Sequence, residues 1–435
     1  MTAFEPVLLA RAALSRLIEP SDAVGQALVA AAGPEPAALI ASGRRQAGTA
    51  LRAEISELLE ERGVRGTGRV FDEALERWRP RAADLAPQRD LETVHRFGGS
   101  LLVPEDGDWP AALLDLGQAM PFCLWTRGSA TIPGLAQCLA VVGSRDATSY
   151  GLAITGDLTA GLVQRGRTVI SGGAYGIDAQ AHRSALAVGT RGSGPEPDPS
   201  RSGIRPAAAG SAPLPTIAVL AGGVDRFYPA GNEDLLRAVA DAGLILSEVP
   251  PGSAPTRWRF LQRNRLIAAL AAATVVVEAR WRSGALNTAH HAAELGRGVG
   301  AVPGSVYSAN SAGCHRLLRD GSAVCVTDPT EVLELADPFA PVPAGGINPN
   351  HAGSSADHDG LRVEDILLLD SLPLRKAVPP QKLTAVAGLG AGAVRAGLAR
   401  LELAGLARRT SEGLWQRAAR PQQKPQPINR EPDGD

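Results

Sequence analysis

The segment CLAVVGSRDATSYG, residues 138–151, decides the fold: an apolar run ends at Gly143, and a polar turn follows it. Short apolar runs bounded by turn residues are typical of buried strands, and the next stretch, AITGDLTAGLVQRG, has the apolar spacing of a helix. A strand that passes through a glycine turn into a helix begins a β-α-β unit. The segment therefore predicts a parallel sheet covered by helices.

The same pattern recurs towards the C-terminus. Further apolar runs alternate with helical stretches, and they are TVISGG (168–173), TIAVLAGG (216–223), LILSE (244–248), TVVVEA (274–279) and VGAVPG (299–304). Alternating strands and helices favour a parallel sheet with both faces buried. We therefore expect an α/β fold over residues 104–336: a Rossmann-like, mostly parallel sheet with helices on both faces.

Two helical segments flank this domain. From Ala10 to about Pro80 apolar residues recur at three and four positions, as in ALRAEISELLEERG, so we expect residues 1–103 to be a helical N-terminal domain (SAM-like). Residues 361–418 show two helical stretches, a longer third one, and two short extended runs about a turn at Gly413. That order is typical of a C-terminal winged helix.

Three further segments have the composition of flexible chain. Each is rich in Pro, Gly, Ser or other polar residues and has no apolar period: 190–215, 337–360 and 419–435. We expect the first to be a disordered insertion in the α/β domain, the second a linker, and the third a disordered tail.

The composition excludes several classes of protein. The formal net charge is −1, so a nucleic-acid partner would have to be recognised by local positive charge. The cysteines, Cys123, Cys138, Cys314 and Cys325, have no metal-ligand spacing, which predicts neither a metal site nor a disulfide framework, and no cofactor motif is present. The sequence shows neither a leader nor a membrane-spanning run, so we expect a cytoplasmic protein with no membrane insertion.

Two glycine turns at predicted strand ends are candidate anion sites. The first is Gly143, Ser144 and Arg145; the second is Ser171, Gly172 and Gly173. A loop that leaves a parallel strand and opens a helix presents backbone N–H groups and a positive helix dipole, which suit phosphate. The alternative is that each is only a tight turn. Asp178 and His182 on the next helix could form an acid–base pair, or Asp178 could simply order the loop.

A third concentration of candidates is TRWRFLQRNRLIAALAAATVVVEARWRSGALNTAHHAAE, residues 256–294. Between 257 and 282 it carries six arginines, Arg257, Arg259, Arg263, Arg265, Arg280 and Arg282, against the single acid Glu278. Phosphate contact by Arg263, Asn264 and Arg265 would fit this charge, with Phe260 or Trp258 available to stack a base. Ser283 and Gly284 open the following helix and could add to the phosphate site. The alternative for the arginines is an internal Arg/Asn network.

The chain resembles the DprA/Smf family of DNA-processing proteins. In order, GSRDATSYG, SGGAYGIDAQAH, AVLAGGVDRFYP, LILSEVPPG, RFLQRNRLIAALA, VVVEARWRSGALNTAHHAAELGR and AVPGS look like the successive motifs of that family, from about Pro104 to Leu335. Phe260-Leu261 stands where the family has Phe-Pro, and SGGA stands where it has SGLA. Both departures concern loop shape.

The resemblance implies a function. A DprA/Smf protein would bind single-stranded DNA without marked sequence preference, protect it, form a homodimer, and help to load the RecA recombinase in natural transformation and recombination. It would have no enzymatic activity. By motif match, the GSR turn, the Ser171 turn and the RNR segment 263–265 would hold the strand.

Two other classes of protein are possible. Rossmann-like nucleotide N-glycosidases of the LOG type need a PGGxGTxxE loop, and the corresponding SGALNTAHHAAE lacks the paired glycines and the Thr. A winged-helix transcriptional regulator would leave the α/β motifs unexplained, and its recognition helix AGAVRAGLARLELAG has few side chains that read base edges.

Overall fold

The computed structural model describes residues 4–128, 130–189, 214–337, 361–373, 377–410 and 413–418. Two compact units, Met1–Val342 and Pro343–Asp435, divide the chain, and each is considered by itself. Residues 190–213, 338–360 and 419–435, where we expect the insertion, the linker and the tail, lie outside the described residues.

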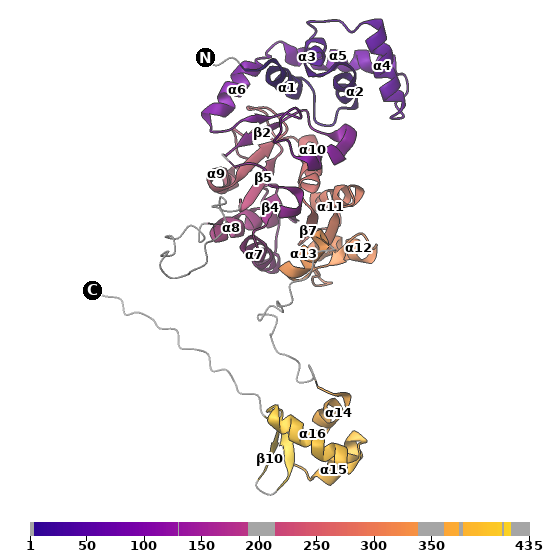
Figure 1. Ribbon diagram of the computed structural model, residues 1–435, viewed down its shortest axis with the longest axis vertical. Helices are drawn as coiled ribbons and strands as arrows, with labels where there is room; N and C mark the ends of the chain where they lie inside the picture. Colours follow the sequence, from indigo (N-terminus) through magenta and orange to yellow (C-terminus); the bar gives the residue numbers. More distant parts are fainter. Residues whose placement is uncertain are drawn as a thin grey trace, which may run out of the picture. The chain divides into compact units, whose positions relative to one another are not determined.

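A nine-stranded sheet forms the centre of the first unit (Figure 1). Its strands are β1 (Leu101–Leu102), β2 (Leu124–Arg127), β3 (Cys138–Val142), β4 (Thr168–Ser171), β5 (Thr216–Leu220), β6 (Leu244–Ser247), β7 (Ala273–Val276), β8 (Gly298–Ala301) and β9 (Val324–Cys325), in the order β1-β2-β6-β5-β4-β3-β7-β8-β9. Strands β3 to β9 pair in parallel, whereas β2 is antiparallel to both β1 and β6. The predicted mostly parallel sheet is confirmed, and each of the six predicted strands is present.

Helices cover both faces of the sheet because every central strand is apolar on both sides. On one face, Ala140 and Val142 of β3 share a core with α10 (Arg257–Ala269), α11 (Gly284–Glu294) and α12 (Ala312–Arg319). On the other, Leu139 and Val141 pack with α7 (Ser149–Gln164), α8 (Ile177–Gly189) and α13 (Pro329–Ala336). Helix α9 (Glu233–Ala242) packs on β5 and β6. The alternation of side chains along a strand produces the two layers.

The N-terminal helices are α1 (Pro6–Leu17), α2 (Ala23–Ala32), α3 (Pro34–Ala41), α4 (Thr49–Glu60), α5 (Thr67–Ala82) and α6 (Pro87–Arg96). They have an apolar core of their own, and they also pack on the sheet: Ala12 and Leu91 share a core with Trp125 of β2. The indole nitrogen of Trp125 lies 3.2 Å from Ser15 Oγ. The helical segment is thus part of the same compact unit as the sheet, and its predicted boundary at residue 103 stays a prediction.

The order of the strands creates a switch point at β3. The chain runs from β3 through β4 and β5 to β6 in one direction along the sheet, then returns through α10 to β7 on the opposite side of β3. The helices that follow β3 and β7, α7 and α11, lie on opposite faces, so the loops that leave the carboxyl ends of these two neighbouring strands diverge. Such a crevice is the usual ligand site of open α/β sheets.

The described residues of the second unit form three helices and a two-stranded antiparallel sheet. They are α14 (Val363–Ser371), α15 (Pro380–Ala387), α16 (Ala391–Leu403), β10 (Ala407–Arg409) and β11 (Trp415–Arg417). Trp415 lies in the apolar core of this unit with Leu368 and Leu398. The predicted order of helices and strands is present, while the assignment as a winged helix stays a prediction.

Candidate functional site

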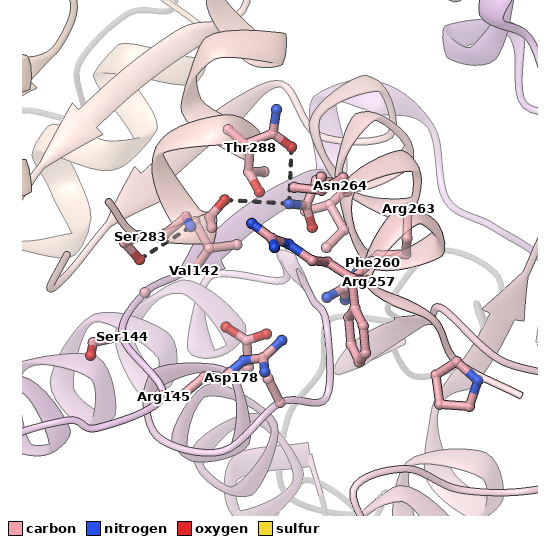
Figure 2. A pocket seen from close by; sticks show the side chains of 18 of the residues that line it. Val142, Ser144, Arg145, Asp178, Arg257, Phe260, Arg263, Asn264, Ser283 and Thr288 are labelled. Atoms are coloured by element: carbon pink, nitrogen blue, oxygen red, sulfur yellow. Dashed lines mark hydrogen bonds between the residues drawn. The ribbon is translucent and has the colours of Figure 1, made fainter. Parts of the chain in front are cut away.

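A cavity of about 740 Å³ lies at the switch point. Most of its lining comes from three segments: the turn after β3, the first half of α10, and the loop after β7 with the start of α11 (Figure 2). Of the residues predicted for the site, the lining includes Gly143, Ser144, Arg145, Phe260, Arg263, Asn264, Ser283 and Gly284. The structure therefore brings together residues that lie up to 141 positions apart in the sequence.

The backbone of the first glycine turn is held by hydrogen bonds, and its Arg145 side chain is exposed. The Ser144 amide donates to the Glu278 carbonyl at 2.7 Å, and the Ser144 carbonyl accepts from the Ile177 amide at 3.1 Å. These bonds tie the turn to β7 and to α8. Arg145 is exposed and makes neither a hydrogen bond nor an ion pair within the described part of the chain. Its guanidinium is available to an anion in the cavity.

The N-terminus of α7 is not open to a ligand, in contrast to the expectation from the sequence. Glu278 is buried, and its carboxylate accepts hydrogen bonds from the Thr148 amide at 2.9 Å and the Thr148 hydroxyl at 2.6 Å. A Cβ on Gly151 would lie 2.3 Å from the same carboxylate. An internal carboxylate thus lies at the positive end of this helix and disfavours a phosphate there.

Phe260 forms the aromatic part of the cavity wall. Its ring lies 4.9 Å from the Arg145 guanidinium and 5.8 Å from that of Arg263, and its centroid is 5.9 Å from that of Tyr228. Arginines over an aromatic face are attracted by the ring quadrupole. The ring is therefore held in place between two cations and a second aromatic side chain.

Arg263 lies behind Phe260 and is buried. Its Nη1 donates to the Val219 carbonyl at 2.8 Å, and the carboxylate of Asp178, which also lines the cavity, is the opposite charge that acts on it most. Burial lowers the pKa of Arg263 to about 10, although Asp178 opposes the shift, so the guanidinium stays charged at neutral pH. Burial likewise raises the pKa of Asp178, against the effect of Arg263 and of the backbone N–H groups around it.

The second glycine turn lies beneath the cavity. Ser171 is buried, and its hydroxyl donates to the Val141 carbonyl at 2.7 Å. Gly172 lies directly under the Arg263 guanidinium, and Gly173 has a positive φ of 68° and packs against Leu236. None of the three lines the large cavity. This turn supports Arg263 and does not present groups to a ligand there.

Arg265 does not reach the cavity either. It forms a two-point ion pair with Glu248, both distances being 2.7 Å, and donates to the carbonyls of Ala119 and Gln262 at 2.8 Å. Both charged side chains are buried. Arg265 of the RNR segment therefore belongs to an internal network, which was the alternative to phosphate contact in the sequence analysis.

The N-terminus of α11 does face the cavity. Ser283 caps the helix by accepting from the Ala285 amide at 3.3 Å, and Gly284 is exposed. Asn264 joins this helix to α10 through its side-chain amide, which donates to the Gly284 carbonyl at 3.3 Å and to Asn287 Oδ1 at 3.1 Å. Asn264 therefore positions the α11 N-terminus at the cavity edge (Figure 2).

Three more arginines line the cavity: Arg257, Arg280 and Arg282. The sequence placed them in the positive cluster but did not assign them to the site. Arg257 and Arg282 are exposed and have no ion-pair partner among the described residues, whereas Arg280 pairs with Asp146 and donates to Asn310 Oδ1 at 2.8 Å. Arg257 begins α10, and Arg280 and Arg282 follow β7. These positions next to a helix start and a strand end were the feature of the sequence that could have assigned the three arginines to the site.

Among the described residues that line the cavity, Asp178 has no histidine beside it that could complete an acid–base pair. His182 is buried outside the lining, and its Nδ1 lies 2.8 Å from Thr216 Oγ1. Within the described residues, no group of three or more His, Cys, Asp or Glu side chains is placed to hold a metal ion. A search of the same residues found no helix long and apolar enough to cross a membrane.

Comparison with known proteins places the chain in a family. The family model for DNA recombination-mediator protein A matches residues 100–196 and 202–337. Over 422 residues the chain is 40% identical to a DNA processing protein DprA of Mycobacterium tuberculosis, and the match covers 94% of each protein. The chain belongs to the DprA/Smf family. The resemblance of its motifs to that family is thereby confirmed.

Other DprA/Smf proteins match a smaller part of the chain. Protein Smf of Synechocystis is 35% identical over 251 residues, which are 56% of each protein. The X-ray structure of DNA processing protein A from Streptococcus pneumoniae superposes with a TM-score of 0.54 at 27% identity, covering 76% of this chain and 98% of that one. The fold of about three quarters of the chain is thus similar to that of a solved DprA structure.

Proposed function

We propose that the chain binds single-stranded DNA in the cavity at the switch point, without marked sequence preference, and that it protects the strand and helps to load the RecA recombinase. DNA uptake, transformation and recombination are the processes in which such a protein acts. The proposal depends most on one observation: three exposed arginines with no carboxylate partner in the described chain, Arg145, Arg257 and Arg282, line a cavity that also contains Phe260.

The geometry suits a single strand. Unpaired arginines bind phosphate oxygens through charge-assisted hydrogen bonds, and an aromatic ring stacks with any base. The α11 N-terminus adds backbone N–H donors at the same edge. A duplex hides its base faces in the stack, so it would use the arginines but not Phe260. Binding should therefore favour single strands and depend little on sequence.

We propose no enzymatic activity. Asp178 is the one carboxylate among the described residues of the lining, and it is buried and compensated by Arg263 and backbone N–H groups. The acid of a nucleotide N-glycosidase would need free access to a glycosidic oxygen. Release of free base from nucleoside monophosphates above a control without protein would favour the LOG-type alternative.

The partners are proposed from the family. A recombination mediator must transfer its strand to a recombinase, and RecA is the bacterial one. We also propose a homodimer in the cytoplasm.

Fluorescence anisotropy with matched single-stranded and double-stranded oligonucleotides tests the proposal. We expect the full chain to bind single strands more tightly, with an affinity that falls steeply as salt rises. Equal affinity for a duplex of any sequence would contradict the role of Phe260, and specific affinity for one duplex would favour the regulator alternative.

A further inference from the structure

Trp281 lies at the edge of the cavity and takes no part in the site described so far. The Ser283 amide donates to the Arg280 carbonyl at 3.1 Å, so residues 280–283 form a β-turn with Trp281 and Arg282 at its centre. Arg282 lines the cavity, whereas Trp281 does not. The turn therefore directs an arginine inward and an indole to the outer side of the same edge.

The indole is supported on one side. The Arg316 guanidinium of α12 lies 5.1 Å from the Trp281 ring. Trp281 is 52% exposed. Arg316 has no ion-pair partner in the described chain. The ring thus has one side against a cation and leaves apolar surface in solvent. The exposed part of the indole is available to stack with a base of a ligand.

The turn that carries Trp281 is fixed at both ends. Arg280 pairs with Asp146, and its side chain also donates to Asn310 Oδ1 at 2.8 Å, while Ser283 caps α11. The Ala279 carbonyl accepts from the Gly313 amide at 2.7 Å, which holds the start of the turn against α12. Little conformational entropy remains to be lost when a ligand contacts the ring.

We propose that Trp281 is a second stacking platform for single-stranded DNA, which receives a base of the strand as it leaves the cavity past Arg282. This inference rests on the proposed function. Arg282 and Arg316 have no ion-pair partner in the described chain and place positive charge beside the ring, which suits a phosphate backbone next to a stacked base. Adjacent Cα atoms are 3.8 Å apart, so the two side chains leave the turn from neighbouring points of the backbone.

The test uses the full chain and a poly-pyrimidine oligonucleotide of the shortest length that binds with full affinity. Each base in turn is replaced by an abasic residue, and the affinity is measured by fluorescence anisotropy. For the wild type we expect two positions at which loss of the base weakens binding. Trp281→Ala should remove the sensitivity at one position, and Phe260→Ala at the other. Trp281→Ala should weaken the intact oligonucleotide about 5- to 150-fold, the range for one stacked base.

Two variants are controls. Trp281→Phe keeps a smaller ring and should retain the abasic pattern with a smaller loss of affinity. Trp258 is on α10 and 53% exposed, does not line the cavity, and has no cation over its ring in the described chain. Trp258→Ala should bind as the wild type. Thermal melting confirms that each variant is folded, which we expect because both indoles are half exposed.

The outcomes separate the two proposals. If the wild type does not prefer single strands, the proposed function fails. If the wild type binds and Phe260→Ala weakens binding, but Trp281→Ala leaves affinity and abasic pattern unchanged, the second platform is wrong and the function stands. If Trp258→Ala, and not Trp281→Ala, removes the sensitivity to an abasic residue at one position, the second stacking platform is on α10. A change in oligomeric mass of Trp281→Ala, measured by light scattering, with the abasic pattern intact would show that the ring contacts a second copy of the chain.

Discussion

The guanidinium of Arg263 lies directly on the Cα of Gly172: a Cβ at residue 172 would stand 1.7 Å from Arg263 Nη1. An exposed arginine would move aside at little cost. Arg263 is buried and bonded to the Val219 carbonyl, so it would have to give up that bond. The contact connects a glycine turn beneath the cavity to the side chain behind Phe260.

We therefore expect Gly172→Ala to destabilise the protein by about 1–3 kcal/mol, the cost of overpacking a well-packed site. It should also weaken DNA binding, because Arg263 supports Phe260. Gly284→Ala is the matched control: it begins α11 with nothing within 4 Å of the added methyl, and its stability should change by less than about 1 kcal/mol. Urea unfolding of both variants measures the difference. Equal effects would mean that Arg263 can move freely.

Arg145→Ala should weaken single-strand affinity to a similar degree for all sequences. Each lost phosphate contact should reduce the slope of log affinity against log salt by about 0.7. Thermal stability should not change, because Arg145 makes no hydrogen bond in the described chain. Arg96 is exposed on α6 and does not line the cavity, so Arg96→Ala should bind as the wild type. An unchanged salt slope for Arg145→Ala would remove the GSR turn from the site.

We expect Arg265→Ala to lower the free energy of unfolding and not to remove a contact with DNA. It would leave the buried Glu248 carboxylate without its partner, which costs about 3–5 kcal/mol. The double replacement Arg265→Met with Glu248→Gln removes both charges and should be less destabilising than the sum of the single changes. Chemical unfolding checks this. If Arg265→Ala kept wild-type stability and lost DNA binding, Arg265 would contact the strand after all.

Stability should decrease in mild acid because of His182. Burial lowers the pKa of His182 to about 3, whereas the ordinary value in an unfolded chain is near 6.5. Between these values the unfolded state binds one more proton than the folded state, so the free energy of unfolding falls as pH drops from 6.5 towards 3, by up to about 1.4 kcal/mol per pH unit. His182→Gln should be less stable at pH 7 and lose less stability between pH 7 and pH 5. Parallel curves for the two proteins would contradict the assignment.

Residues 1–337 should fold and bind as the full chain does, since the second unit is compact by itself. Residues 104–337 should be much less stable, because they lack β1 and the helices that bury Trp125. The Arg259 guanidinium would also lose Glu19, whose carboxylate it contacts at 2.9 Å and 3.0 Å. Circular dichroism and anisotropy of the two fragments test this. Equal stability would make the N-terminal helices an independent domain.

The central strands could be predicted from the sequence because each is a short apolar run with a turn after it. The edge strands could not: β1 and β9 have two residues each, too few to show a period. Arg263 and Arg265 look alike in the sequence. Their different environments depend on the rotation of α10 and on Glu248 and Ala119, whose positions are set by tertiary packing. The acceptor at the α7 N-terminus, Glu278, is likewise distant in sequence from Thr148.

That internal acceptor has a consequence for selectivity in the cell. A free nucleotide carries its highest charge density on a terminal phosphate, and the bare N-terminus of a helix is where Rossmann-like proteins hold such a group. With Glu278 already bonded to Thr148, the dianion of a mononucleotide would meet a carboxylate instead of a row of free amides. The abundant pool of metabolic nucleotides is therefore expected to be a poor competitor, and a polymer, whose phosphates each carry a single charge, becomes the favoured ligand.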